Sequence, residues 1–175
     1  DAMGAVVEMN PADHISAGCV GEVGKRTFFI QARKDSDLLT LLCEKFQLQQ
    51  LVGGIREFTE ELQRKNPDLP EPVLDYTEAE MGLQEPLEPL FRVGQMGVEY
   101  DDENDLMVLV AQELTSEEED AADAGTARIW ATRSQMMVMG AHGDEVASRG
   151  RPICGNCLQP MDPQGHFCPK RNGHK

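Results

Sequence analysis

The chain has 175 residues, of which 40% are hydrophobic, and a formal net charge of −15 at pH 7. This length fits one compact domain with a small appendage. No run of 18 or more apolar residues occurs, so we expect no membrane-spanning segment. The amino terminus lacks a basic segment followed by an apolar one, so we expect no secretory signal either.

The negative charge is distributed unevenly. Residues 149–175 carry five basic side chains and one acidic side chain, a net charge of +4, which leaves −19 for residues 1–148. Lysine and arginine are needed to neutralise phosphate groups, so the acidic part disfavours contact with nucleic acid or an anionic membrane. Only the basic tail, defined here as residues 149–175, is suited to such a contact.

The first predicted unit is a hairpin followed by a helix. Residues 26–33 and 38–43 predict two strands joined by a polar turn, which together indicate an antiparallel hairpin. Apolar residues then recur at spacings of three and four between Leu48 and Leu62, as in an amphipathic helix. Gly53 and Gly54 interrupt this stripe. Close packing of the helix against the sheet is their ordinary explanation.

An acidic, proline-rich segment follows at residues 66–89. It holds five of the ten prolines of the chain, with frequent Asp and Glu between them. Proline lacks a backbone donor and is poorly tolerated inside a helix or a central strand. We therefore expect an extended surface linker that is at best partly ordered.

The second predicted unit repeats the strand-and-helix pattern. Strands are expected near residues 90–100, 106–111 and 126–133, and a helix from about Ser134 to Ala147, with Ser134 as its N-cap. The apolar side of this helix would include Met136, Met139 and Val146. The acidic residues around Glu117 are expected to form a solvated loop.

A weak internal similarity links the two units. Residues 37–44 resemble residues 105–112, and residues 44–48 resemble residues 132–136 at the start of each helix. Short apolar strands also resemble each other by chance, so duplication and coincidence both stay open. The predicted fold class is α+β, an antiparallel sheet built from two hairpin-plus-helix units over residues 1–148, with a small zinc ribbon at residues 149–175.

The basic tail carries a compact set of candidate metal ligands. Cys154, Cys157 and Cys168 provide three thiolates, which are good zinc ligands, and the fourth ligand is His166 or His174. The glycine before His166 permits a sharp turn there, which favours His166. Five candidates for four positions indicate a closed, structural site and not a catalytic one. Ordering some 20 residues costs about 1–2 kcal/mol each, and metal binding worth about 10–16 kcal/mol offsets part of this.

The remaining cysteines and histidines give weaker signals. Cys19 and Cys43 stand alone and are expected to be buried, inert thiols. Isolated cysteines beside one metal-ligand cluster are typical of a reducing cytoplasm. His14 and His142 have no obvious acid or nucleophile beside them, so we expect histidines whose hydrogen bonds are satisfied.

Three ordered segments resemble an uncharacterised bacterial family, the domain-of-unknown-function family 3090. They are residues 18–32, residues 91–96 with Tyr100 and Asp101, and residues 154–173. The resemblance covers roughly residues 10–174. It implies a cytoplasmic bacterial protein with a metal-binding tail and supplies no established reaction. Tyrosine often replaces the last histidine in the family, which again favours His166 over His174 as the ligand.

Three functional hypotheses follow. The leading one is a non-enzymatic protein-interaction or regulatory module with structural zinc, because no catalytic constellation is visible and a basic tail adjoins an acidic body. The tail side chains Arg149, Arg151, Lys170 and Arg171 would contact an acidic protein partner. The second is an enzyme with a pocket between sheet and helices that uses Arg26, Arg33 or His14. The third is nucleic-acid contact through the basic tail.

Overall fold

The computed structural model describes residues 5–22, 24–116 and 123–149. Its strands are β1 (Val6–Met9), β2 (His14–Val20), β3 (Thr27–Lys34), β4 (Asp37–Cys43), β5 (Phe91–Asp101), β6 (Leu106–Glu113) and β7 (Thr126–Thr132). Its helices are α1 (Lys45–Lys65), the short 3-10 helix η1 (Glu78–Met81) and α2 (Arg133–Ser148). Among the described residues, no helix is both long and apolar enough to cross a membrane.

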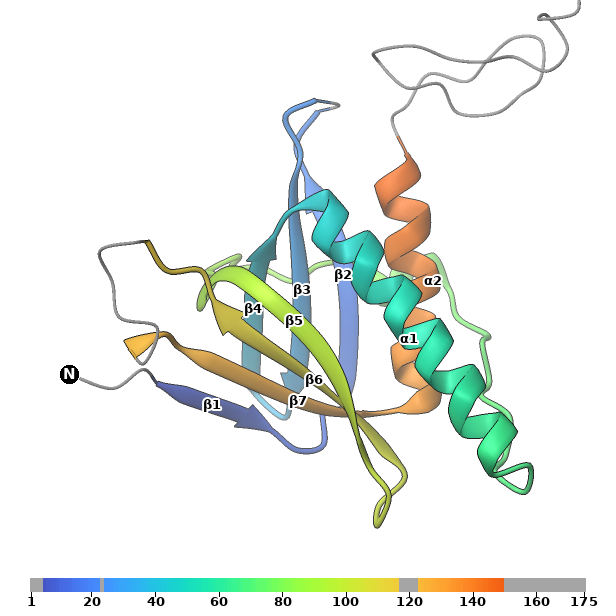
Figure 1. The fold of residues 1–175 in the computed structure, drawn as a ribbon. Coiled ribbons are helices and arrows are strands. Elements are labelled where there is room, and N and C mark those ends of the chain that lie inside the picture. The colour runs from blue at the N-terminus through green and yellow to red at the C-terminus, as the bar shows by residue number, and fades with distance from the viewer. Residues whose placement is uncertain (1–4, 23, 117–122, 150–175) are drawn as a thin grey trace, which may run out of the picture.

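The seven strands form one mixed sheet in the order β1-β7-β6-β5-β4-β3-β2 (Figure 1). The predicted antiparallel sheet is therefore wrong, although helices and strands do combine as α+β. β1 pairs in parallel with β7, and β4 pairs in parallel with β5. The physical reason lies in the connection between β4 and β5, which includes α1 and a long extended segment. Such a crossover returns the chain to its starting edge, so that β5 runs in the same direction as β4.

The first predicted hairpin is confirmed. β3 and β4 are antiparallel partners, with Phe28 opposite Cys43 and Lys34 opposite Asp37. The strands β5, β6 and β7 also form where the second unit was expected. The two strands that precede the hairpin, β1 and β2, were not predicted.

Both long helices begin with the same arrangement of hydrogen bonds at their N-caps. In α2 the Thr132 hydroxyl accepts a hydrogen bond from the Gln135 backbone N–H at 3.0 Å, and Gln135 Oε1 accepts one from the Thr132 N–H at 2.8 Å. In α1 Gln47 Oε1 accepts from the Glu44 N–H at 2.8 Å. These reciprocal bonds form a capping box. Thr132, and not the predicted Ser134, is therefore the N-cap of α2.

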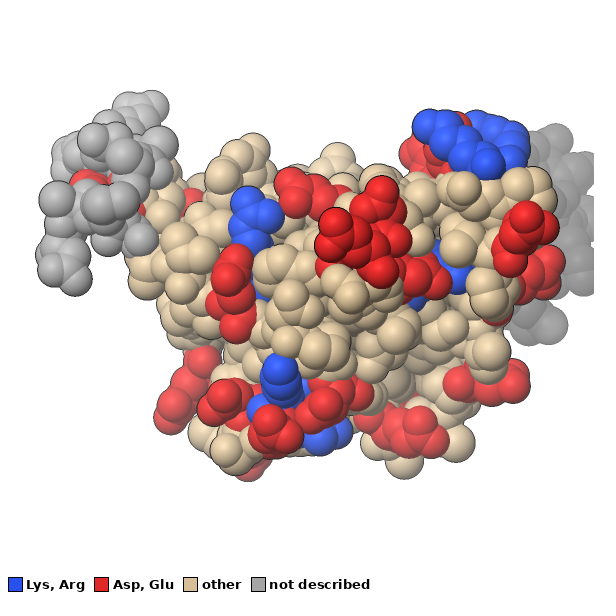
Figure 2. Space-filling model, turned by 90° about the horizontal axis from the view of Figure 1, so that it is seen from below, with Lys and Arg blue, Asp and Glu red and all other residues tan. Residues whose placement is uncertain are grey.

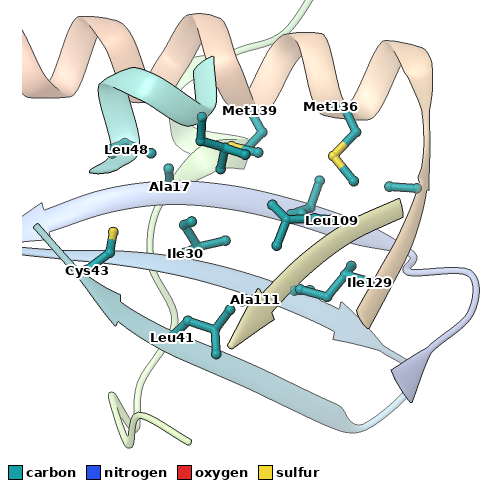
Figure 3. Close-up of a cluster of buried hydrophobic side chains, with 14 of the residues drawn as sticks. Ala17, Ile30, Leu41, Cys43, Leu48, Leu109, Ala111, Ile129, Met136 and Met139 are labelled. Atoms are coloured by element: carbon teal, nitrogen blue, oxygen red, sulfur yellow. The ribbon is translucent and has the colours of Figure 1, made fainter. Parts of the chain in front are cut away.

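The hydrophobic core lies between the helices and one face of the sheet (Figure 3). Ala17, Ile30 and Leu41 stand opposite one another across β2, β3 and β4, and all are fully buried. Met136 and Met139 of α2 are buried above them, as predicted, and Val146 is also buried. This assigns the methionine-rich stretch of α2 mainly to packing.

The segment between α1 and β5 covers the second face of the first three-stranded part of the sheet. Its Met81 is only 2% exposed, and the carbonyl oxygen of Met81 accepts a hydrogen bond from the Ser16 hydroxyl. The Gln31 side chain donates to the Gln84 carbonyl oxygen at 2.8 Å and accepts from the Gln84 N–H at 2.8 Å. The prediction of a partly ordered linker is therefore right about the extended backbone and wrong about the packing.

The basic tail beyond Arg149 lies outside the described residues, and so does the zinc ribbon expected there. In the described part of the chain, no group of three or more His, Cys, Asp or Glu is placed to hold a metal ion. The division into residues 1–148 and 149–175 therefore stays a prediction.

Candidate functional site

A groove of about 400 Å³ runs between α1 and β5. We call it the α1–β5 groove. The helix contributes side chains spaced by three and four residues, so that one stripe of α1 forms one wall. The other wall is the strand itself. The lining residues are Phe46, Gln47, Gln50, Leu51, Gly54 and Phe58 of α1 and Gly94, Gln95, Met96, Gly97 and Val98 of β5.

The groove exists because β5 leaves β4 early. β4 pairs with β5 only at Leu41–Phe91 and Leu42–Arg92, whereas β6 stays paired with β5 as far as Asp101. Beyond Arg92, the described part of the chain gives β5 no ladder partner on its β4 side. Figure 1 shows β5 diverging from β4, with α1 beside it. We call this stretch, residues 93–101, the open edge of β5.

Gln47 fixes the helix at the start of the open edge. Its side-chain amide donates hydrogen bonds to the carbonyl oxygens of Val93, at 3.1 Å, and Gly94, at 3.2 Å. Two adjacent carbonyl groups are accessible here because the register of β5 against β6 shifts between Val93 and Gln95. Such a bulge re-aims the backbone. A side chain of α1 therefore takes the place that a neighbouring strand would occupy.

The floor of the groove is apolar, and its mouth combines amide side chains with one aromatic ring. Met96 and Val98 are partly buried against the core, and so is Phe58, whose ring lies 6.4 Å from that of Tyr100. At the mouth, Phe46 is 60% exposed, and Gln50 and Gln95 are also exposed. Aromatic residues are enriched in protein interfaces, so an exposed ring next to an apolar floor is compatible with a contact surface.

Two glycines leave the groove open. A Cβ atom placed on Gly54 or on Gly97 would meet no other atom within 4 Å. Gly53, next to Gly54 on α1, is equally unconfined. The expectation that the helix glycines permit close packing is therefore wrong. Nothing in the structure explains Gly53.

The far end of the groove is held by a charged network. Arg133 is 6% exposed and forms two hydrogen bonds to the Asp105 carboxylate, at 2.8 and 2.9 Å. The Tyr100 hydroxyl donates to the same carboxylate at 2.7 Å. Burial, followed by this hydrogen bond, raises the pKa of Tyr100 to about 12, and the Arg133 guanidinium holds the pKa of Asp105 below its ordinary value. The network fixes the end of β5 against α2.

Acidic side chains surround this end. Asp102 and Glu103 of the β5–β6 turn and Glu57 of α1 are exposed, and within the described residues none of them forms an ion pair. The turn and the carboxyl end of α1 both lie at the bottom of Figure 1. The view from below shows acidic side chains spread over this face, with fewer basic ones (Figure 2).

The predicted metal ligands cannot be placed. Cys154, Cys157, His166 and Cys168, and the alternative ligand His174, all lie outside the described residues. Zinc binding therefore stays a prediction. Arg149, expected to contact a partner, pairs with Glu145 at 2.9 Å and with Glu78.

The three residues suggested for an enzyme pocket do not form one site, although two of them are neighbours on adjacent strands. Arg26 donates hydrogen bonds to the carbonyl oxygens of Val146, at 3.1 Å, and Ala147, at 3.5 Å, at the carboxyl end of α2. Arg33 lies at the opposite end of β3, roughly 20 Å away for a strand of this length. His14 is the cross-strand partner of Arg33. None of the three lines the α1–β5 groove.

The isolated histidines and cysteines differ in part from expectation. His14 Nε2 and His142 Nδ1 are buried without a hydrogen-bond partner in the described part of the chain, so these histidines are not fully satisfied. Burial lowers the pKa of both, helped by Arg33 at His14 and by Arg149 at His142. Cys43 is buried as expected, and burial raises the pKa of its thiol to about 12. Cys19 is only half-buried.

Comparison with protein families gives one match. Residues 7–168 fit the model described as "Protein of unknown function (DUF3090)". The chain belongs to this family. The resemblance in the three ordered segments is thereby confirmed, and the family description supplies no activity. Comparisons with curated proteins and with solved structures gave no match.

The groove residues were missed by reasoning from the sequence. The signal available was glycine in unusual places: Gly53 and Gly54 inside a helix, and Gly94 and Gly97 inside a strand. Glycine within a strand often marks a bulge or the close approach of another backbone. Gly94 fits both cases, because the register of β5 against β6 shifts between Val93 and Gln95 and a Cβ atom on Gly94 would lie 3.0 Å from the Leu114 Cα. A Cβ atom on Gly97 would meet nothing within 4 Å in the described part of the chain, so Gly97 fits neither case.

Proposed function

We propose that this protein is a non-enzymatic protein-interaction module whose contact surface is the α1–β5 groove. The observation that carries the proposal is the open edge of β5 beside an apolar floor and an exposed Phe46. Edge strands that are not blunted recruit other chains. The catalytic candidates named from the sequence lie outside the groove, whose lining, among the described residues, holds no acid, base or nucleophile.

A matched pair of glycine variants tests this role. Gly54→Trp places an indole ring in the groove, and Gly53→Trp places the same ring on the neighbouring position of α1 outside the lining. Neither position confines a Cβ atom, so both variants are expected to fold. Affinity capture from host lysate should recover partners with Gly53→Trp and lose them with Gly54→Trp. Identical partner sets for the two variants would contradict the proposal.

We also propose that the basic tail binds one structural zinc ion through Cys154, Cys157, Cys168 and His166. The spacing of these residues supports the proposal, and the family match ends at residue 168, so that it includes all four and not His174. The metal would order the tail without chemistry of its own. Elemental analysis should give one zinc per chain, and Cys157→Ser should lose it. A metal content that Cys157→Ser leaves unchanged would contradict this assignment.

The proposal includes a reducing, cytoplasmic setting. It is supported by Cys19 and Cys43, which are both free thiols, and by the ligand role proposed for the other three cysteines.

A further inference from the structure

We infer that the α1–β5 groove binds an extended, cationic segment of a partner protein, which adds to β5 as an extra strand. The inference rests on the proposed function and specifies its mode of recognition and its partner chemistry. Strand addition draws affinity from main-chain hydrogen bonds and specificity from pockets for alternate side chains. The groove supplies both elements.

The main-chain element is the open edge of β5. In a strand, the backbone groups alternate between its two neighbours, so half of those in residues 95–101 face the side that β4 has left. On β5, the Gln47 side chain bonds only the carbonyl oxygens of Val93 and Gly94, at the start of this stretch. From Gln95 onward, the half of the backbone groups that faces away from β6 has no ladder partner among the described residues and can pair with a visiting strand of about six residues, at 3.2–3.4 Å per residue.

The side-chain element is the cavity between the strand and the helix. Every second side chain of an added strand would point toward α1, because side chains alternate between the two faces of a sheet. There it would meet Phe58 and Met96 on the floor and Phe46 at the mouth. Gly54 leaves room on the helix side. This predicts apolar residues at alternate positions of the visiting segment.

Charge selects the partner. The chain carries a net charge of −15, and near the far end of the groove Asp102 and Glu103 of the β5–β6 turn and Glu57 of α1 are exposed and form no ion pair with any described residue. A second copy of the same chain would bring like charge to this edge, which opposes self-association. A segment bearing lysine or arginine between its apolar residues is attracted instead, with a faster association rate at low salt.

Selection from a random ten-residue peptide library displayed on phage tests the inference. The bait is the immobilised full chain, with Gly54→Trp as counter-selection and Gly53→Trp as the control. We expect enriched peptides in which basic and apolar residues alternate. Enrichment of acidic peptides, or of apolar residues at spacings of three and four, would overturn strand addition by a cationic segment while leaving the groove as an interaction site. If no peptide is enriched in a way that depends on Gly54, the proposed function is overturned as well.

A second pair of variants tests the charge argument without changing the fold. Gln50 lines the groove, and Gln49 is exposed beside it on α1 outside the lining. Gln50→Arg and Gln49→Arg have the same net charge. Gln50→Arg should weaken binding of the best selected peptide at least fivefold relative to Gln49→Arg. Equal affinities would overturn the placement of a cationic segment in this groove.

N-methylation of the best selected peptide tests the mode of binding. Methylating one backbone nitrogen at a time removes one donor at a time. We expect losses of at least tenfold at every second position within the bound stretch and small effects at the positions between. Uniform or absent sensitivity would overturn strand addition. If the full chain binds nucleic acid or lipid vesicles and binds no peptide, the inference that its partner is a protein is overturned.

Discussion

Gly53 and Gly54 lower the stability of α1 without any packing reason, and replacing them tests that statement directly. Both lie inside a helix of 21 residues, and a Cβ atom at either position meets nothing within 4 Å. Alanine is more favourable than glycine in a helix interior by about 0.8–1.0 kcal/mol. Each substitution alone should therefore raise the free energy of unfolding by nearly that amount, and the two together by roughly 2 kcal/mol, because the two added methyl groups share no contact partner.

The size of the effect is readily measured. For a chain of this length, 1 kcal/mol shifts the melting temperature by about 2–4 °C, so the double variant should melt roughly 4–8 °C higher. Urea denaturation should show a higher midpoint with an unchanged slope, because the surface exposed on unfolding stays the same.

Gly143→Ala on α2 provides the contrast. Its Cβ atom would lie 3.3 Å from the Ala17 Cβ and 3.5 Å from the Leu48 Cδ1. It should therefore gain less stability than either change on α1, because crowding offsets part of the propensity gain. Destabilisation by Gly53→Ala or Gly54→Ala would show that α1 is packed closely at that position, and destabilisation by Gly54→Ala would refute the open groove.

Three further outcomes are expected. Gln47→Ala removes two hydrogen bonds to β5 and one to Glu44, and should lower the free energy of unfolding by about 1–2 kcal/mol in urea, whereas the exposed Gln49→Ala should change it little. Asp105→Asn suits the left-handed backbone at this position, φ 51°, and removes the charge paired with Arg133. The folded pKa of Asp105 lies below its ordinary 3.8, so the contribution of the carboxylate to the free energy of unfolding is complete above pH 3.8 and is lost as the pH falls through the folded pKa. The difference in stability between wild type and Asp105→Asn should therefore disappear at that low pH. A difference that does not depend on pH would contradict the assignment. His142 has a folded pKa below its ordinary 6.5, so protonation favours the unfolded chain, and the urea midpoint should fall between pH 7 and pH 5 by less in His142→Phe than in wild type; equal falls would show that His142 is not the group responsible.

The local elements were predictable from the sequence wherever the hydrophobic pattern was regular. The β3–β4 hairpin and both long helices follow from alternation and from spacings of three and four, whereas the start of α2 was placed at Ser134 instead of Thr132. β2 was missed because Ser16 and Gly18 break its apolar alternation and face a covering segment instead of solvent. The backbone of that covering segment is hydrogen-bonded at Gln84 by the side chain of Gln31, and these two residues are 53 positions apart in the sequence.

The sheet order and the candidate site were not predictable, because both depend on pairings between distant segments. Nothing local in Phe91 or Leu41 specifies that the two residues pair in parallel and that the ladder then stops. The open edge is a consequence of that stop. The polar and aromatic residues that line the groove are unremarkable in the sequence, and they become a site only when α1 and β5 lie side by side.

Residue-resolved amide exchange across β5, with and without the best selected peptide, tests the central claim most directly. In the free protein, amides of residues 95–101 should alternate between protected, where they bond to β6, and rapidly exchanging, where they face the open edge. Bound peptide should protect the rapidly exchanging set and leave the other unchanged. Uniform protection of β5 in the free protein, or no change when the peptide binds, would contradict the account.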